Sequence, residues 1–344
     1  MSRRKLSEQQ QRRIQQNQKN RIHSAEANEG EEFGEANGPD RKGLVIARFV
    51  RHIDIRISEG AREGERLRCH VRANLPAITV GDRVIFRESA QQEGVIVALE
   101  ERHSLIERPD GFGNLKPVAA NIDQIFIVIA PEPEPHPNLI DRYLVAAENA
   151  GIEARLVFNK SDLLTEENPY AALLESYRAL GYPVFTTSCA DHYGIETLRE
   201  AIANRISIFA GQSGVGKSSL VNALVPGLHA PTGTLSDTVS KGRHTTTTAS
   251  LFELPHGGYL IDSPGIREFH LYHFSRQQVF AGYREFRNAI GHCHFRDCEH
   301  SKEPGCAIKA VLNEGKMAVT RRQSLEYILD SRIDQPGSKS PEKG

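Results

Sequence analysis

Two nucleotide-binding motifs occur in this chain in an inverted order, and that order limits the folds that the chain can adopt. Residues 211–219 read GQSGVGKSS, which matches the phosphate-binding pattern G-x-x-x-x-G-K-[ST] between an expected strand at 205–210 and an expected helix from Leu220. The guanine-reading pattern N-K-x-D, at Asn159 to Asp162, lies upstream of this loop instead of downstream. A mostly parallel α/β sheet with circularly permuted chain order can hold both motifs.

The phosphate loop carries the clearest chemical expectations. Its glycines let backbone N–H groups converge on the β-phosphate, and the following helix N-terminus adds partial positive charge. We expect Lys217 to reach the β- and γ-phosphates and to serve catalysis, and Ser218 to ligate Mg2+. The expected nucleotide contacts in this loop are Gly211, Gln212, Ser213, Gly214, Val215, Gly216, Lys217, Ser218 and Ser219.

The guanine-reading segment consists of Asn159, Lys160, Ser161 and Asp162, directly after an expected buried strand at 154–158. The Asp162 carboxylate would accept from the N1–H and the 2-amino group of guanine, whereas adenine has no matching donors. The next expected strand, 184–186, ends at residues 187–189, where a backbone N–H can address the guanine O6, and we assign Ser188 to this site. N-K-x-D alone is short enough to arise by chance, with Asp162 then acting as a helix cap.

Two further elements follow the phosphate loop. Residues 242–247 read GRHTTT, and a threonine there would close over the γ-phosphate and complete the Mg2+ shell, with Thr246 favoured and Thr245 as the alternative. An expected hairpin at 251–254 and 259–261 leads into the D-x-x-G element, in which Asp262 would hold Mg2+ through water and the Gly265 N–H would sense the γ-phosphate. This element continues into the C-terminal segment, so the γ-phosphate could act on that segment directly.

The residue after D-x-x-G bears on hydrolysis. It is Ile266, whose aliphatic side chain cannot orient an attacking water, so we expect slow intrinsic hydrolysis. His244 is the candidate for the missing polar catalytic group, acting when a partner orders its loop. The alternative is a loop histidine that only packs or contacts RNA.

The region 41–112 is rich in β-structure, with expected strands at 43–50, 53–57, 66–71, 83–87 and 94–99. About five short strands without a helical pattern predict a small closed barrel, of which the OB-fold is a common example. At 66–72 the cations Arg66, Arg68, His70 and Arg72 alternate with Leu67, Cys69 and Val71, which places the cations on one face and the apolar residues in the core. A cationic face suits a nucleic-acid backbone, and a merely solvated strand face is the alternative.

The C-terminal region holds a cysteine and histidine cluster. Cys293, Cys298, His300 and Cys306 supply three thiolates and an imidazole, the ligands of a closed, structural Zn2+ site. The spacing is not a common finger pattern, and His292, His294 and Asp297 are competing ligands. An expected helix at 316–330 carries Lys316, Arg321 and Arg322, which suggest a further basic surface.

The expected organisation has several parts. They are a disordered tail at 1–40, the barrel at 41–112, the α/β nucleotide domain at 113–274, the zinc-binding domain at 275–335 and a flexible tail at 336–344. Within the nucleotide domain, a helix at 139–150 connects strands at 122–130 and 154–158. The longest apolar stretch, Ile125 to Ala130, is too short to cross a bilayer, so we expect a cytoplasmic protein without a membrane partner. We expect a monomer.

Taken together, these segments resemble one bacterial family, the ribosome small subunit-dependent GTPase A (RsgA or YjeQ) family. The resemblance covers about residues 41–335, including the NKSD, GQSGVGKSS, GRHTTT and DSPGIREF segments and the zinc spacing. It implies a multidomain fold, in which an OB-fold barrel precedes an α/β circularly permuted P-loop GTPase domain and a small α-helical zinc-binding domain. It also implies binding to the small ribosomal subunit and its rRNA late in maturation, with GTP hydrolysis accompanying release.

One alternative to this function stays open. The protein could be a nucleotide-gated RNA-binding assembly clamp whose cationic surfaces do the work, with hydrolysis secondary. A P-loop kinase or ATPase is a third reading, which the NKSD segment opposes.

Overall fold

The computed structural model describes residues 38–89, 93–110, 114–164, 168–225, 250–262 and 274–331. The chain divides into two compact units, the first made of Met1–Ile122, Thr247–Phe252 and Ile261–Ser263 and the second of the remaining residues. The expected tails lie outside the described residues, apart from residues 38–40. Within the described ranges, no helix is both long and apolar enough to span a membrane.

The first unit contains a five-stranded barrel. Its strands are β1 (Arg41–Arg48), β2 (Ile53–Ile57), β3 (Arg66–Val71), β4 (Arg83–Glu88) and β5 (Gly94–Leu99). The order β1-β2-β3-β5-β4 closes because β1 also pairs with β4, and β3 runs parallel to β5. Inward side chains such as Val45, Ile55 and Phe86 fill the interior. The predicted barrel is therefore confirmed.

Strand β3 follows the predicted alternation only in part. Leu67 and Cys69 are buried at 3% and 0% exposure, while Arg66, Arg68 and His70 face outward. The prediction that Val71 lies in the core is wrong, since its side chain is 39% exposed. It is the last residue of β3, where strand pairing ends and the core no longer covers the side chain.

A second β-element of this unit was not expected from the sequence. Strands β6 (Leu105–Pro109) and β7 (Leu115–Ala120) form an antiparallel hairpin, and the expected domain boundary at 112 falls between them. Pro109 and Pro117 weaken the strand signal, because proline lacks the N–H that a strand ladder needs.

The second unit is built on a parallel sheet. Its strands β8 (Gln124–Ile129), β9 (Glu153–Phe158), β10 (Val184–Thr186) and β11 (Ile206–Ala210) lie in the order β10-β9-β8-β11, and all three pairings are parallel. Strand β8 is buried along its whole length, as expected of a strand covered on both faces. The connecting helices are α2 (Pro137–Ala150), α3 (Ala171–Ala179) and α4 (Ile195–Ile202), and α5 (Lys217–Leu224) follows β11.

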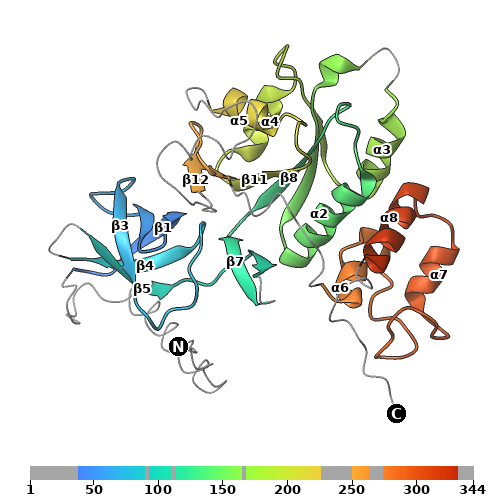
Figure 1. Cartoon of the computed structure of the whole chain (residues 1–344), viewed down its shortest axis with the longest axis horizontal. Coiled ribbons are helices and arrows are strands. Elements are labelled where there is room, and N and C mark those ends of the chain that lie inside the picture. Colours follow the sequence, from blue (N-terminus) through green and yellow to red (C-terminus); the bar gives the residue numbers. More distant parts are fainter. Residues whose placement is uncertain are drawn as a thin grey trace. The chain divides into compact units, whose positions relative to one another are not determined.

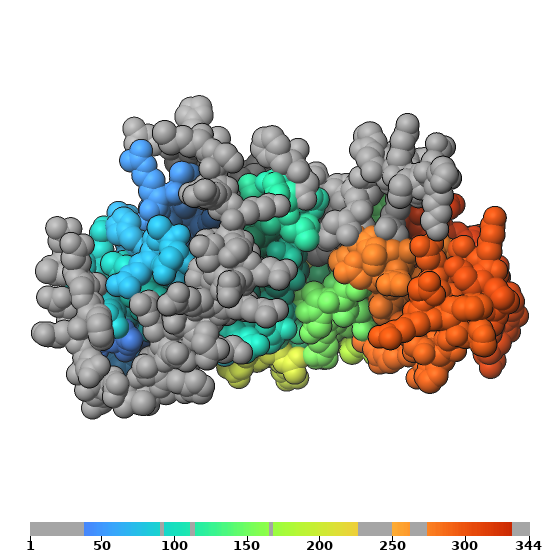
Figure 2. Space-filling view, turned by 90° about the horizontal axis from the view of Figure 1, so that it is seen from below, coloured from blue at the N-terminus to red at the C-terminus, as the bar shows by residue number. Residues whose placement is uncertain are grey.

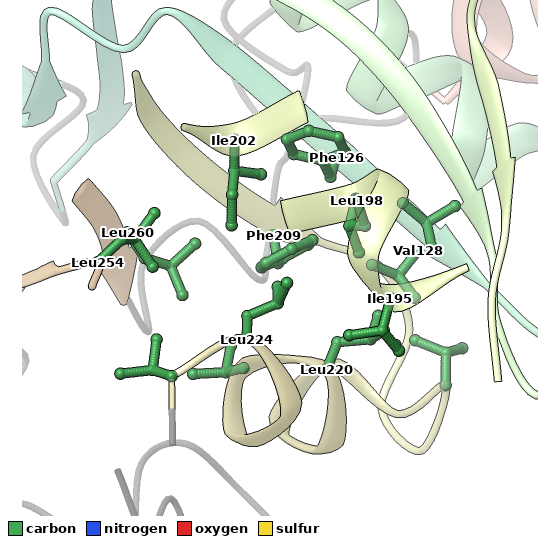
Figure 3. Packing of buried hydrophobic residues seen from close by; sticks show 14 of the residues in the cluster. Phe126, Val128, Ile195, Leu198, Ile202, Phe209, Leu220, Leu224, Leu254 and Leu260 are labelled. Atoms are coloured by element: carbon green, nitrogen blue, oxygen red, sulfur yellow. The ribbon is translucent and has the colours of Figure 1, made fainter. Parts of the chain in front are cut away.

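The core between the sheet and helices α4 and α5 is apolar. Figure 3 shows Leu198 and Ile202 of α4 and Leu220 of α5 packed toward Phe126 and Phe209 of the strands. These contacts hold the start of α5 against the end of β11, and the expected phosphate loop joins these two elements.

Strands β12 (Ser250–Glu253) and β13 (Tyr259–Asp262) match the predicted hairpin at 251–254 and 259–261. The turn between them closes through hydrogen bonds from the Leu254 amide to the Gly258 carbonyl and from the Gly257 amide to the Leu254 carbonyl. Gly257 and Gly258 have φ of +81° and +87°, and a Cβ on Gly258 would come within 2.7 Å of the Arg205 backbone. The turn therefore requires glycine at this position.

The C-terminal helices pack on α2. They are α6 (Arg276–Ala281), η4 (Arg284–Phe286), α7 (Ala307–Asn313) and α8 (Val319–Asp330). Their core includes Phe280, Phe286 and Ile308 together with Val145 and Ala146 of α2. Figure 1 shows α6 and α8 alongside α2, and Figure 2 shows orange C-terminal residues against green residues of this unit.

The predicted basic surface on α8 is wrong for Arg321, which is only 1% exposed. Its guanidinium donates to Asp141 of α2 and, at 2.8 and 2.9 Å, to both carboxylate oxygens of Glu285. Two carboxylates can offset the cost of burying a guanidinium. Both carboxylates come from other elements, Asp141 from α2 and Glu285 from η4, so the sequence of α8 alone does not predict the burial of Arg321. Lys316 and Arg322 remain exposed, and they pair with Glu314 and Glu326.

Candidate nucleotide site and metal centre

The expected nucleotide residues gather at one edge of the parallel sheet. The phosphate loop follows β11, the N-K-x-D segment follows β9, and residues 187–189 follow β10. Because the strands are parallel, their carboxyl ends share an edge, which is the usual ligand position in α/β sheets.

The phosphate loop depends on glycines at close approaches. Gly211 has φ of +136°, and a Cβ there would lie 2.2 Å from the Val128 carbonyl oxygen. Gly216 has φ of +91°, and a Cβ there would lie 2.3 Å from the Asn159 side-chain nitrogen. The loop can therefore touch both neighbouring strand ends only with glycine at these two positions.

Helix α5 begins at Lys217 with Gly216 as its N-cap. The first N–H groups of a helix have no partner within it, and together with the helix dipole they favour an anion. The buried Lys217 folds over the loop, and its Nζ donates to the carbonyls of Gly211 at 2.8 Å and Gln212 at 2.5 Å. Ser218 lies half-buried in the first turn, and Ser213 and Gly214 are exposed. This arrangement fits a bound phosphate chain.

Asn159 joins the guanine-reading segment to the phosphate loop. It is 1% exposed, and its Nδ2 donates to the Val215 carbonyl at 2.9 Å. The Thr187 hydroxyl donates to the Asn159 Oδ1 at 3.0 Å. One side chain thus connects three loops, so the two inverted motifs meet although 56 positions separate Asn159 from Val215.

Lys160 continues this contact. It adopts left-handed backbone angles, and its Nζ donates to the Glu132 carbonyl at 2.8 Å. The Ser161 amide donates to the Thr187 carbonyl. The Lys160 stem therefore lies across the loop that connects β8 to α2, as one wall of the site.

Asp162 is exposed and is oriented by Ser188. The Ser188 hydroxyl donates to Asp162 Oδ1 at 2.6 Å and accepts from the Ala190 amide at 3.2 Å. A carboxylate can accept several hydrogen bonds, so Asp162 retains capacity for an additional pair of donors. The Ser188 amide donates to the Tyr193 carbonyl, so the contact of Ser188 within the site is through its hydroxyl.

Cys189 forms a neutral part of the same loop. Burial, with a smaller contribution from Asp162, raises the pKa of its thiol to about 11. The thiol therefore stays protonated at neutral pH, and it points toward Asn159 Oδ1 at 4.0 Å.

Several predicted residues cannot be placed. His244, Thr245, Thr246, Gly265 and Ile266 lie outside the described residues. Asp262 is described as the last residue of β13, but its side chain is not.

Cys293, Cys298, His300 and Cys306 converge in the C-terminal region. Their ligand atoms all lie within 4.8 Å of one another. His300 Nδ1 is 3.5 Å from the sulfurs of Cys293 and Cys306, and these sulfurs are 4.0 Å apart. A tetrahedron with Zn–S of about 2.3 Å and Zn–N of about 2.0 Å has edges of roughly 3.5 to 3.8 Å, so the cluster fits a zinc ion.

The competing ligands are not part of this group. Among the described residues, the set that could hold a metal omits His292, His294 and Asp297. The imidazole of His300 packs edge to face on Phe280, with ring centroids 5.1 Å apart, and Cys298 and Cys306 are buried in the α6–α8 core. The cluster therefore has the enclosed character of a structural site.

The sequence interpretation missed the loop between β8 and α2. Glu132 accepts from Lys160, and Pro133 lies 3.5 Å from where a Gly214 Cβ would be. Its backbone contacts depend on no recognisable side-chain pattern. The run PEPEPHP at 131–137 does signal an irregular, stiff connection directly after a buried strand, and that signal could have suggested this wall.

Comparison with known proteins agrees with this geometry. The model of the RsgA GTPase family matches residues 99–272. The curated protein "Small ribosomal subunit biogenesis GTPase RsgA" of Azotobacter vinelandii is 51% identical over 337 residues, which cover 96% of this chain and 98% of that protein. The protein of the same name from Pseudomonas aeruginosa (strain LESB58) is 50% identical over 337 residues, covering 96% and 98%.

Two solved structures share the fold. The crystal structure of YjeQ from Thermotoga maritima is 32% identical, with a TM-score of 0.68, and the match covers 86% of this chain and 100% of that one. The structure of YloQ, described as a circularly permuted GTPase, is 25% identical, with a TM-score of 0.67 and coverage of 86% and 96%.

Proposed function

The chain belongs to the RsgA GTPase family, and on this basis we propose that it hydrolyses GTP during biogenesis of the small ribosomal subunit, in response to that subunit. The expected family resemblance and the GTPase assignment are confirmed. The relatives' names favour the biogenesis GTPase over the RNA-binding clamp.

One observation carries the nucleotide part of this proposal. Asn159 holds the guanine-reading segment against the phosphate loop through Val215, and Ser188 orients Asp162 in the same edge of the sheet. A base reader and a phosphate cradle in contact with each other are what a guanine nucleotide requires.

We assign the individual roles as follows. Asp162 reads the guanine N1–H and 2-amino group, and the Lys160 stem covers the base. The amides of Thr187 and Ser188 are bonded to Phe158 and Tyr193, so the Cys189 amide is our candidate donor to O6. Residues 211–219 hold the phosphates, with Lys217 on the β- and γ-phosphates.

We propose that Ser218, in the first turn of α5, ligates Mg2+ and that Thr246 and Asp262 complete the set, with the Gly265 amide at the γ-phosphate. The ion would neutralise charge on the phosphates when bound. Lys217 already points its ammonium over the loop, so little rearrangement is needed for it to contact phosphate.

Ile266 provides no group to orient water, and we propose that His244 supplies it when the subunit orders its loop. His244→Ala should abolish most of the subunit-stimulated hydrolysis and leave the slow hydrolysis without subunits unchanged. Multiple-turnover phosphate release with and without subunits measures both rates. Equal stimulation in the variant and the parent protein would reject the catalytic role of His244.

The remaining assignments concern partners. We propose that the Cys3His cluster holds one structural zinc ion, which would brace the C-terminal helices. We also propose contact with rRNA through the barrel, a monomeric state and action in the cytoplasm, where ribosomal subunits mature.

Phosphate release from GTP, with ATP as the control substrate, tests the function. Purified small subunits should stimulate hydrolysis of GTP strongly and of ATP not at all, while large subunits should have little effect. Equal turnover of both nucleotides, or indifference to the small subunit, would contradict the proposal.

A further inference from the structure

Helix α2 lies between the phosphate loop and the C-terminal helices. On the face of α2 that packs against the C-terminal helices, Glu148 accepts from Arg284 at 2.6 Å and from Arg287 at 3.2 Å. On the same face, Asp141 accepts from Arg321. On the other side α2 lies next to the phosphate loop, where Tyr143 lines a small hollow together with Gly211 and Val215. Because these ion pairs, of which Asp141–Arg321 is buried, anchor α2, the helix can act as a rigid support for that loop.

Tyr143 makes the contact from α2 to the loop. Its side chain is 1% exposed, and its hydroxyl oxygen accepts a hydrogen bond from the Gly211 amide. Burial raises the pKa of Tyr143 to about 12, so the hydroxyl remains neutral at physiological pH. Apolar residues such as Ile127 and Val128 of β8 and Ile140 of α2 line most of the same hollow.

Gly211 is the residue at which the loop leaves β11. Its φ of +136° and the proximity of Val128 exclude any side chain, so glycine is required there. Because glycine has few restrictions on its backbone angles, contacts with neighbouring groups must hold the conformation of Gly211. The Gly211 carbonyl, on the other side of the same Cα, accepts from Lys217 Nζ at 2.8 Å, so a rotation at Gly211 would also displace the ammonium.

We propose that Tyr143 is a positioning residue of the phosphate loop, which holds the Gly211 peptide so that the loop and Lys217 keep the geometry that receives the phosphates. This inference rests on the proposed nucleotide site. Tyr143 acts through Gly211 and does not contact the nucleotide. Since the hydroxyl supports phosphate binding and acts on Lys217 only through Gly211, its loss should raise KM for GTP more than it lowers kcat.

The test compares two tyrosine-to-phenylalanine variants of the full chain. Tyr143→Phe removes only the hydroxyl that bonds Gly211. The matched control is Tyr182→Phe, because Tyr182 is equally buried and its hydroxyl donates at 3.1 Å to Glu148, near the C-terminal end of α2. Lys217→Ala serves as the control for the site itself. The measurements are the dissociation rate of fluorescently labelled GDP, KM and kcat for GTP, and Tm.

Tyr143→Phe is expected to release GDP about three- to tenfold faster, the usual range for one lost hydrogen bond, and to raise KM by a similar factor. Tyr182→Phe should lower Tm at least as much and release GDP at the parent rate. Parent-like release by Tyr143→Phe, or equal acceleration in both variants, would overturn the positioning role and leave the nucleotide site intact. Parent protein that binds no GDP, or binding that survives Lys217→Ala, would overturn both proposals.

Discussion

At the scale of single residues, the proposed base specificity rests on Asp162. Its carboxylate is held at 2.6 Å by the Ser188 hydroxyl, which itself accepts from the Ala190 amide, so the acceptor oxygens are oriented before a base arrives. A site arranged in this way discriminates mainly by leaving its own polar group unpaired against the wrong base.

Asp162→Asn should therefore weaken GTP binding by about two orders of magnitude or more and admit xanthosine triphosphate, since an amide N–H can donate to the 2-carbonyl of xanthine. Competition binding with the three nucleoside triphosphates of guanosine, xanthosine and adenosine measures this change. Asp191→Asn is the control, because Asp191 is an exposed acidic residue whose backbone amide donates to the same Ser188 hydroxyl at 3.4 Å. Undiminished preference for GTP in Asp162→Asn would reject the base-reading role.

At the scale of elements, helices α2 and α8 are joined by buried charges. Burial raises the pKa of Asp141, and the nearby Arg321 only partly counteracts this effect. Burial disfavours the charge on Arg321, but Asp141 and Glu285 more than offset it and raise its pKa. Tyr177 donates to Asp141 at 2.8 Å, and the Tyr283 ring lies 4.3 Å from the guanidinium carbon. The network therefore contains two carboxylates that depend on one cation.

Arg321→Met should destabilise the second unit by about 3 to 5 kcal/mol, because it leaves Asp141 and Glu285 buried without their partner. Thermal unfolding should shift downward by about 10 °C in a unit of this size. Arg322→Met is the matched control, since the guanidinium of Arg322 is exposed and pairs with Glu326 one helical turn away. That variant should change stability by less than about 0.5 kcal/mol. Comparable losses in both variants would contradict the network.

The stability defect of Arg321→Met should depend on pH. Asp141 has a raised pKa in the folded state, so the folded state holds the proton more tightly than the unfolded state does. Its contribution to stability is therefore largest at low pH and decreases as the pH rises above the ordinary aspartate value. Without Arg321 the pKa should rise further, so the defect of Arg321→Met should be smaller at pH 5 than at pH 8.

The Cys3His cluster allows a second prediction at this scale. Purified protein should carry about one zinc ion, and Cys306→Ser should lose it and lower the unfolding temperature, because Cys306 lies in the core formed with Phe280 and Ile308. Cobalt in place of zinc should give the absorption of a tetrahedral thiolate site, which reports the ligands independently of activity. Cys69→Ser is the control, since Cys69 is a buried cysteine of the barrel core. Full zinc content in Cys306→Ser would exclude this cluster as the zinc site.

At the scale of the whole molecule, the permuted order separates chain connectivity from spatial arrangement. The guanine-reading loop precedes the phosphate loop in sequence, yet Asn159 and Val215 are in contact. Parallel strands make this possible, because every strand delivers its following loop to the same edge whatever the order of the strands along the chain. The D-x-x-G element is then followed by the C-terminal helices.

The barrel face can be tested as an rRNA contact. Arg66 pairs with Asp54 at 3.4 Å, and His70 contacts Glu93 at 2.9 Å, which makes the exposed Arg68 the best single probe of β3. Arg68→Glu should weaken binding to small subunits and reduce the salt dependence of binding by about one counterion. Arg178→Glu, at an exposed arginine of α3 paired with Glu175, is the control. Unchanged affinity and salt dependence in Arg68→Glu would exclude β3 from the interface.

The sequence alone determined the identity of the motifs and most of the regular elements. The phosphate loop, the N-K-x-D segment and the cysteine spacing are recognisable because their chemistry requires given residue types at short separations. Strands such as β8 were predictable because burial on both faces demands a continuous apolar run. The β6–β7 hairpin was missed because its prolines mask a strand signal that pairing nevertheless supports.

Only the tertiary structure decided which polar residues are buried and what they hold. Arg321 resembles a surface cation in its own helix, and its burial depends on Asp141, 180 positions away, and Glu285, 36 positions away. Tyr143 resembles an ordinary core tyrosine until the fold brings Gly211 to its hydroxyl. Local sequence records the preferences of a residue, whereas the balance between desolvation and pairing is set by neighbours that the chain supplies from a distance.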